Sequence, residues 1–229
     1  MRAYLEIQLS RLKTKNLFNK KNPSKKFLTL QEFYRSLHAG ILTNEEKNSI
    51  YNGKTTMVFA KILKEIINKN NIKNLLDYGS GKGERYFKSS EFGMETYPPL
   101  EKYWGINPTL YDPGVPHPKP IGEKFDIVIS IDVLEHIPLD DLGWVVEEIF
   151  EFSKKIVFIN VACYPAERSF ADGSNVHVSV FHPMWWYGFI TKVALNHNKK
   201  CFLVCSTFEN NKFQFSNFAI NDDFKNYTN

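Results

Sequence analysis

A glycine-rich segment in the first half of the chain is the first candidate for chemistry. Residues 75–86 read LLDYGSGKGERY, in which Asp77 is followed by Gly79, Gly81 and Gly83 at alternate positions. Because glycine has no Cβ, such a loop lets the backbone approach a bound molecule closely. An apolar run that ends in an acid and glycines predicts a ligand-binding turn between a strand and a helix. A tight turn that binds nothing is the alternative.

The glycine spacing argues against two common nucleotide-binding loops. A Walker A loop ends in Gly-Lys-Ser/Thr, but Gly83 follows Lys82, and Leu76 stands where its first glycine is needed. A dinucleotide loop has the spacing G-x-G-x-x-G, and Glu84 takes the place of its third glycine. An acid at a helix start also disfavours a pyrophosphate. NAD is therefore only a second choice.

Two further segments supply acids after predicted strands. Asp112, in the sequence LYDPG, offers a carboxylate that suits a vicinal diol, although Asp-Pro-Gly is also a good surface turn. Residues 125–138 read FDIVISIDVLEHIP, an apolar run followed by Asp132, Glu135 and His136.

Together these segments resemble the class I S-adenosylmethionine-dependent methyltransferases. Asp77 and the three glycines match the first motif, and residues 125–138 match the fourth-strand signature. The resemblance implies that Asp77, the glycines, Asp112 and Asp132 bind S-adenosylmethionine, with Asp112 accepting hydrogen bonds from the ribose. The alternation of predicted strands and helices, followed by a predicted C-terminal antiparallel hairpin, indicates a three-layer Rossmann-like α/β sandwich with a mostly parallel sheet.

The chain departs from that family in two places. Asp77 and Asp112 are far apart for a tight strand-helix-strand unit, so residues 87–103 are expected to form an inserted loop. Between Asp112 and Phe125 a proline-rich segment leaves little room for a third strand and helix. No residue can be assigned to the adenine.

The acceptor is expected to bind at residues 160–189, after the fifth predicted strand of the family pattern. This stretch resembles methyltransferases of bacterial surface-polysaccharide genes, which implies an O-methyltransferase acting on a sugar or glycan precursor. His177 and His136 are candidate catalytic bases because imidazole titrates near neutrality; each could instead be a hydrogen-bonded structural histidine. Candidate substrate-binding residues are Tyr164, Arg168, Asn175, Trp185 and Trp186, although Trp-Trp-Tyr also suits a core.

The elements that must position these residues follow from hydrophobic periodicity. Strands are predicted at 74–78, 103–106, 125–131, 154–162, 201–206 and 212–220. Helices are predicted at about 30–39, near 43–52, from 55 with Val58, Ile62, Leu63 and Ile66 on one face, at 140–152 and at 183–195.

The chain is expected to divide into an N-terminal basic arm with short helices, 1–52, and a methyltransferase domain, 53–229. Residues 1–26 hold eight Lys or Arg and one Glu. Such an arm can bind nucleic acid or simply be solvated, so an RNA methyltransferase is an alternative, as are an N-methyltransferase and a non-catalytic S-adenosylmethionine-binding regulator. RNA is not the favoured partner, because the basic residues of the arm are not interleaved with aromatic residues in the way typical of RNA readers.

The composition fits a globular protein of the reduced cytoplasm. Of 229 residues, 43% are hydrophobic, and no apolar run is long enough for a membrane span or a signal-peptide core. Cys163, Cys201 and Cys205 lie in apolar segments and predict buried thiols rather than disulfides. No metal is expected.

Overall fold

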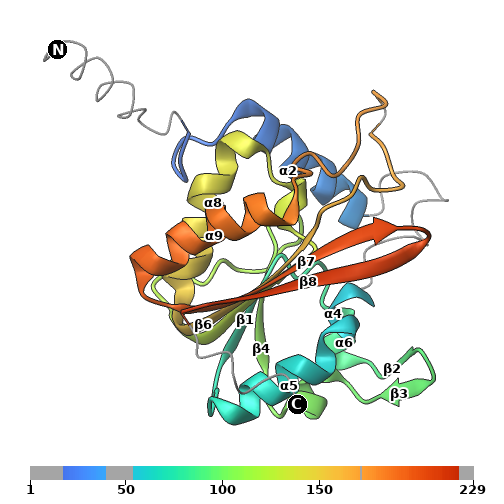
Figure 1. Cartoon of the computed structure of the whole chain (residues 1–229), viewed down its shortest axis with the longest axis vertical. Coiled ribbons are helices and arrows are strands. Elements are labelled where there is room, and N and C mark those ends of the chain that lie inside the picture. Colours follow the sequence, from blue (N-terminus) through green and yellow to red (C-terminus); the bar gives the residue numbers. More distant parts are fainter. Residues whose placement is uncertain (1–17, 40–53, 171, 222–229) are drawn as a thin grey trace, which may run out of the picture.

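The computed structural model describes residues 18–39, 54–170 and 172–221. It is a mixed α/β structure with a six-stranded, mostly parallel sheet in the order β4-β1-β5-β6-β7-β8. The strands are β4 (Pro108–Tyr111), β1 (Leu75–Tyr78), β5 (Phe125–Ile131), β6 (Ser153–Ala162), β7 (Lys200–Glu209) and β8 (Lys212–Ile220). Only β8 is antiparallel to its neighbour in this sheet (Figure 1). The arrangement is compatible with a Rossmann-like fold.

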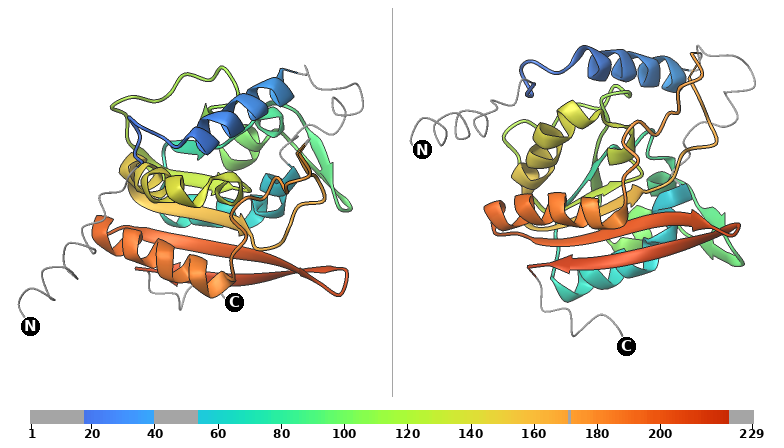
Figure 2. Two further views of the ribbon diagram at one scale, coloured as in Figure 1. Left: turned by 90° about the horizontal axis from the view of Figure 1, so that it is seen from above. Right: turned by 45° about the horizontal axis from the view of Figure 1, so that its top comes forward.

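The helices connect these strands and cover the sheet (Figures 1 and 2). They are α2 (Lys25–His38), α4 (Lys54–Val58), α5 (Ala60–Lys69), α6 (Glu84–Phe87), α7 (Leu100–Trp104), α8 (Leu139–Phe152) and α9 (Pro183–His197), with a 3-10 turn η1 (Leu134–His136). Within the described residues, no helix is long and apolar enough to cross a membrane.

Two hydrophobic clusters pack on the sheet. Neighbouring residues of one strand divide between them: Leu76 and Val128 belong to one cluster, Leu75 and Ile127 to the other. Because successive strand residues face opposite sides, the clusters lie on opposite faces. The first cluster includes α8 and α9, the second α5 and α7. Burial on both faces explains why β5 and the central part of β6 are predominantly apolar in the sequence.

The strand order has a switch point next to β1. From β1 the chain crosses to β4 on one side and then returns to β5 on the other side of β1. The loops after β1 and β5 therefore start at neighbouring carboxyl ends, and the helices that follow them, α6 and α8, pack on opposite faces of the sheet. Open α/β sheets bind ligands at such a point.

Several predicted elements are confirmed, among them β5 over 125–131, β8 over 212–220 and α8, which begins one residue earlier than expected. Helix α2 begins at Lys25 instead of residue 30, because Ser24 and not Thr29 caps it: the Ser24 hydroxyl accepts a hydrogen bond from the Phe27 amide. The predicted helix near 43–52 and the boundary at 52/53 lie outside the described residues.

The predicted strand at 103–106 is wrong. Tyr103 and Trp104 end helix α7, where Gly105 with φ +71° forms the C-cap, and the strand begins only at Pro108. The expected inserted loop also contains structure, an antiparallel pair of β2 (Ser90–Phe92) and β3 (Glu95–Tyr97). Between β4 and β5 the described chain forms no strand, as the proline-rich sequence predicted.

The predicted buried face of the helix after residue 55 is half wrong. Leu63 and Ile66 are buried, but Val58 and Ile62 are exposed. The helix is interrupted at Phe59, and the buried residues of α5 are Ala60, Leu63, Ile66 and Ile67, so Ile62 lies beside the buried face. Cys201 and Cys205 are buried free thiols as expected, whereas Cys163 is half-buried.

Candidate functional site

The glycine loop is fixed by contacts with the neighbouring strand ends. The amides of Gly79 and Ser80 donate to the carbonyl oxygen of Tyr111, at 2.7 and 3.2 Å. Gly79 has φ +90°, and a Cβ built there would lie 2.3 Å from Cγ2 of Val133. Glycine is therefore required at this position because the loop after β1 presses against the loop after β5. The glycine-rich segment and the segment 125–138 therefore contact each other here.

Asp112 joins the end of β4 to the glycine loop. Its carboxylate accepts hydrogen bonds from the amides of Gly81 (2.9 Å) and Gly114 (2.7 Å). Each carboxylate oxygen has two acceptor positions, so the bonds to these amides leave acceptor positions for further hydrogen-bond donors. His117, which the sequence analysis missed, lies on the other side of Gly81, with Nε2 3.0 Å from its carbonyl oxygen. Only its place in a proline-rich loop could have drawn attention to it.

Asp77 lies beneath the loop rather than on its surface. The carboxyl group is 4% exposed and accepts a hydrogen bond from the Tyr86 hydroxyl at 2.7 Å. Burial raises the pKa of Asp77 to about 7, although the bond from Tyr86 opposes this shift. Its influence on a ligand would therefore act through charge.

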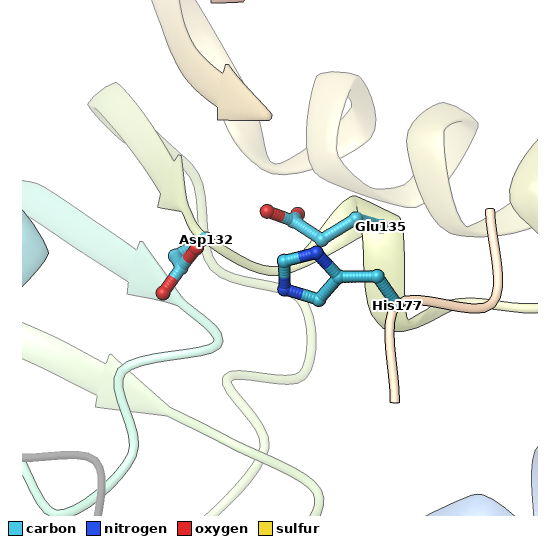
Figure 3. A group of neighbouring side chains, drawn as sticks. All are labelled: Asp132, Glu135 and His177. Atoms are coloured by element: carbon cyan, nitrogen blue, oxygen red, sulfur yellow. The ribbon is translucent and has the colours of Figure 1, made fainter. Parts of the chain in front are cut away.

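A second group of side chains collects after β5. Asp132, Glu135 and His177 each place one potential ligand atom within 4.8 Å of the others, and Figure 3 shows Glu135 and His177 pointing toward Asp132. We call these three residues the Asp-Glu-His cluster. Asp132 stands at the end of β5 with φ +61°, which a short acidic side chain tolerates better than most. His177 comes from the loop between β6 and α9.

Each member of this cluster is held by one hydrogen bond from outside it. Thr55 Oγ1 donates to Asp132 Oδ2 at 3.2 Å. The Ala162 amide donates to Glu135 Oε1 at 2.7 Å. His177 Nδ1 lies 2.7 Å from the Tyr164 carbonyl oxygen, to which it must donate. The basic nitrogen of His177 is therefore Nε2.

Glu135 is the most buried member, with no exposed surface. Burial, and then the negative charge of Asp132, raise its pKa well above the usual range. Within the described part of the chain, Glu135 Oε2 has no hydrogen-bond partner. A buried carboxyl oxygen without a partner is costly, which is typical of a site built for something else to bind.

His136 faces a different set of groups. Its Nδ1 lies 2.7 Å from the Tyr34 hydroxyl and 3.0 Å from the Val176 carbonyl oxygen. Burial lowers its pKa to about 4, against the influence of Asp132. Its ring centroid is 4.8 Å from that of His177. His136 therefore connects the cluster to helix α2.

Helix α2 lies beside this edge of the sheet (Figure 2). Besides Tyr34, it contributes Arg35, whose Nε donates to the Pro113 carbonyl oxygen at 3.1 Å, and Phe33, which packs on Phe170 of the loop after β6. The sequence analysis assigned no site role to α2. An amphipathic helix far from the motifs gives no local signal of this position.

Some of the predicted substrate-binding residues lie near the Asp-Glu-His cluster, and others do not. Tyr164 lies beside His177, with ring centroids 5.7 Å apart. Asn175 braces the loop through bonds to Ala166 and to the His177 amide. Trp185 is partly exposed and stacks on Phe181, whereas Trp186 is completely buried in the first hydrophobic cluster. Arg168 lies in the same loop, where its carbonyl oxygen accepts from the Val176 amide.

Comparison with models of known protein families and with curated proteins found no match for this chain.

Proposed function

We propose that this protein is an S-adenosylmethionine-dependent methyltransferase that methylates a hydroxyl of a sugar or glycan precursor. One observation carries the proposal: the glycine loop, Asp112 and Asp132 converge at the switch point of the sheet. On this proposal the fold is a three-layer Rossmann-like sandwich closed by β7 and β8. NAD is disfavoured by Glu84, which begins α6 where a pyrophosphate would need the helix start.

The residues present fit the chemistry of this cofactor. S-adenosylmethionine carries an ammonium, a sulfonium and a ribose diol but no phosphate. Asp77 and Asp132 would offset positive charge, and Asp112 would accept from the ribose hydroxyls. Gly81, with φ +53°, is held by Asp112 and would present bare backbone to the ligand.

The reaction is an in-line displacement at the methyl carbon. The hydroxyl oxygen forms a bond to that carbon, the sulfur–carbon bond breaks, and the electron pair stays on sulfur as the thioether of S-adenosylhomocysteine. Because the sulfonium is already a good leaving group, alignment and removal of the hydroxyl proton are what the protein must supply. The Asp-Glu-His cluster would receive that proton, with Nε2 of His177 as the basic nitrogen.

The geometry favours His177 over His136 for this role. Nε2 of His177 belongs to the cluster at the carboxyl end of β5, whereas Nδ1 of His136 contacts Tyr34 and the Val176 carbonyl group. The partly exposed ring of Trp185 and the ring of Tyr164 would offer aromatic faces to a sugar.

The cofactor half of the proposal is tested by calorimetric titration with S-adenosylhomocysteine. We expect micromolar binding that falls about tenfold or more in Gly81→Val and Asp112→Ala, since both disrupt the loop. Gly93→Val is the matched control: Gly93 also has positive φ but lies in the β2–β3 turn with no atom near a built Cβ. The cofactor half would be overturned if all three variants weakened S-adenosylhomocysteine binding equally. It would also be overturned if the unaltered protein did not bind S-adenosylhomocysteine either with or without candidate acceptors.

The acceptor half needs a transfer assay with radiolabelled S-adenosylmethionine. Sugars, nucleotide sugars and oligosaccharides should accept label, and alkali-stable O-methyl products should form. Labelling of amines or RNA, but of no sugar derivative, would reject the proposed acceptor while leaving the cofactor assignment intact.

A further inference from the structure

We infer that the Asp-Glu-His cluster is a binding site for one divalent metal ion of the first transition series, coordinated by Asp132, Glu135 and His177. The sequence analysis expected no metal. The site itself stands on geometry alone. The role given to the ion below rests on the proposed function.

The spacing of the donor atoms suits such an ion. Carboxylate oxygens and imidazole nitrogens bind these ions at about 2.0–2.2 Å, so opposite ligand atoms lie roughly 4.2 Å apart. The three donors lie within 4.8 Å of one another. Small side-chain rotations would bring them onto one ion. Two carboxylates and one imidazole leave further coordination positions for water or a hydroxyl.

The surroundings of the cluster resemble the outer shell of a metal site. A metal-binding histidine usually donates its other ring N–H to a backbone carbonyl or a carboxylate, which fixes the tautomer. His177 does this through Nδ1 to Tyr164, so Nε2 carries the lone pair. Ala162 and Thr55 orient the two carboxylates in the same way.

Glu135 gives an independent reason to place an ion here. Its side chain is fully buried and points toward Asp132, and its Oε2 has no hydrogen-bond partner among the described residues (Figure 3). Two carboxyl groups this close repel when both are ionised. A cation would satisfy the unpaired oxygen and remove the repulsion.

A bound ion would also deepen the proposed reaction. A hydroxyl that coordinates a divalent cation loses its proton more readily, so the ion could replace a general base. Nε2 of His177 would then be a ligand, and the hydroxyl proton would leave to water.

The direct test is a titration of the EDTA-treated, buffer-exchanged full chain with Mn²⁺. Electron paramagnetic resonance reports the free hexaaqua ion, so bound Mn²⁺ appears as lost signal. We expect one site per chain, weakened about tenfold or more in Glu135→Gln and in His177→Gln. Glutamine at 135 keeps the shape and the acceptor for the Ala162 amide.

Two matched controls come from a pair at the other end of the sheet. Glu147 and His197 contact each other at 2.6 Å, between α8 and the end of α9. Glu147→Gln and His197→Gln should bind Mn²⁺ like the unaltered protein. Mn²⁺ should also raise the melting temperature of the unaltered protein and both controls but not of the two cluster variants.

Absence of Mn²⁺ binding, or equal binding in all four variants, would overturn the site. If Glu135→Gln does not fold by circular dichroism, His177→Gln alone decides. S-adenosylhomocysteine titrations of the unaltered protein separate the two proposals. If that protein binds S-adenosylhomocysteine but no Mn²⁺, only the metal site is rejected. Methyl transfer that persists fully in EDTA would reject the ion's catalytic role. Whether the ion binds at all is decided by the Mn²⁺ titration.

Discussion

At the scale of single residues, burial of an acid under the glycine loop has a consequence for stability. Asp77 has a pKa of about 7 in the folded protein against an ordinary value of 3.8, so the folded state holds a proton that the unfolded state has lost. The stability associated with this proton is complete below pH 3.8 and is lost as the pH rises through about 7. Between these two pH values, this group lowers the free energy of unfolding by about 1.4 kcal/mol per pH unit.

The unaltered protein should lose folding stability as the pH rises toward 7, and Asp77→Asn should abolish this loss. We expect the variant to gain on the unaltered protein by a few kcal/mol between pH 5 and pH 8, since asparagine does not ionise. Urea unfolding at several pH values measures this. Parallel stability curves for the two proteins would contradict the assignment. Above pH 7, where the Asp77 carboxyl group is ionised, the same substitution should also weaken S-adenosylhomocysteine binding, because the proposed function uses this negative charge.

The contact between Gly79 and Val133 gives a second prediction at this scale. Gly79→Ala should destabilise by roughly 2–4 kcal/mol, combining positive-φ strain with a Cβ 2.3 Å from a Val133 methyl. Gly122→Ala is the control, since Gly122 has φ +76° and no atom within 4 Å of a built Cβ; it should cost only about 1 kcal/mol.

The double variant Gly79→Ala/Val133→Ala separates the two causes. If the steric contact dominates, removing the valine methyls should restore part of the lost stability in chemical denaturation. Strictly additive losses would show that backbone strain alone is responsible.

At the scale of elements, the start of helix α2 is anchored through Ser24 and Phe27. The Ser24 hydroxyl donates to Asp141 Oδ2 at 2.5 Å, its amide donates to Oδ1 at 2.9 Å, and Phe27 packs on Trp144. Ser24 thus caps α2 and ties it to the start of α8. This attachment holds Tyr34 against His136.

Ser24→Ala should loosen α2 more than it destabilises the whole protein. We expect a loss of about 1–2 kcal/mol, because both the cap and a buried hydrogen bond disappear. Hydrogen exchange should quicken in residues 25–38. Ser36→Ala, within the same helix, should leave stability and exchange nearly unchanged. If hydrogen exchange in Ser24→Ala quickens no more in residues 25–38 than in the rest of the chain, α2 is held by its apolar face alone.

At the scale of the whole molecule, one lysine of the basic arm, Lys20, pairs with a buried acid of the fold. Lys20 and Lys119 each approach the buried carboxylate of Glu148 at 2.7 Å, and Tyr78 donates to it at 2.8 Å. These lysines neutralise a buried acid, so their charge is not available in full to an RNA backbone.

Binding to RNA distinguishes the alternative role of the arm. We expect the full chain to retain no RNA at 150 mM salt, and removal of residues 1–17 to leave S-adenosylhomocysteine binding unchanged. Truncation before residue 18 keeps Lys20 and Ser24 in place. Filter binding that falls steeply with salt and disappears on this truncation would favour an RNA methyltransferase.

The sequence by itself determined most strands and the later helices. β5, β6 and β8 are recognisable because apolar continuity or β-rich composition is a local property of the chain. It misplaced β4, since the aromatic Tyr103 and Trp104 suggested a strand while Gly105 closed a helix there. It also misjudged Ile62, which lies beside the buried face that Ala60, Leu63, Ile66 and Ile67 form on α5.

The tertiary structure alone decided which residues meet. The sequence pointed to Asp132 and His177 separately, but only the parallel pairing of β5 with β6 brings their loops together with Glu135. The same holds for Gly79 against Val133 and for Tyr34 against His136. Periodicity records how each residue is buried locally, whereas strand order and helix docking depend on packing between distant segments, which no local pattern encodes.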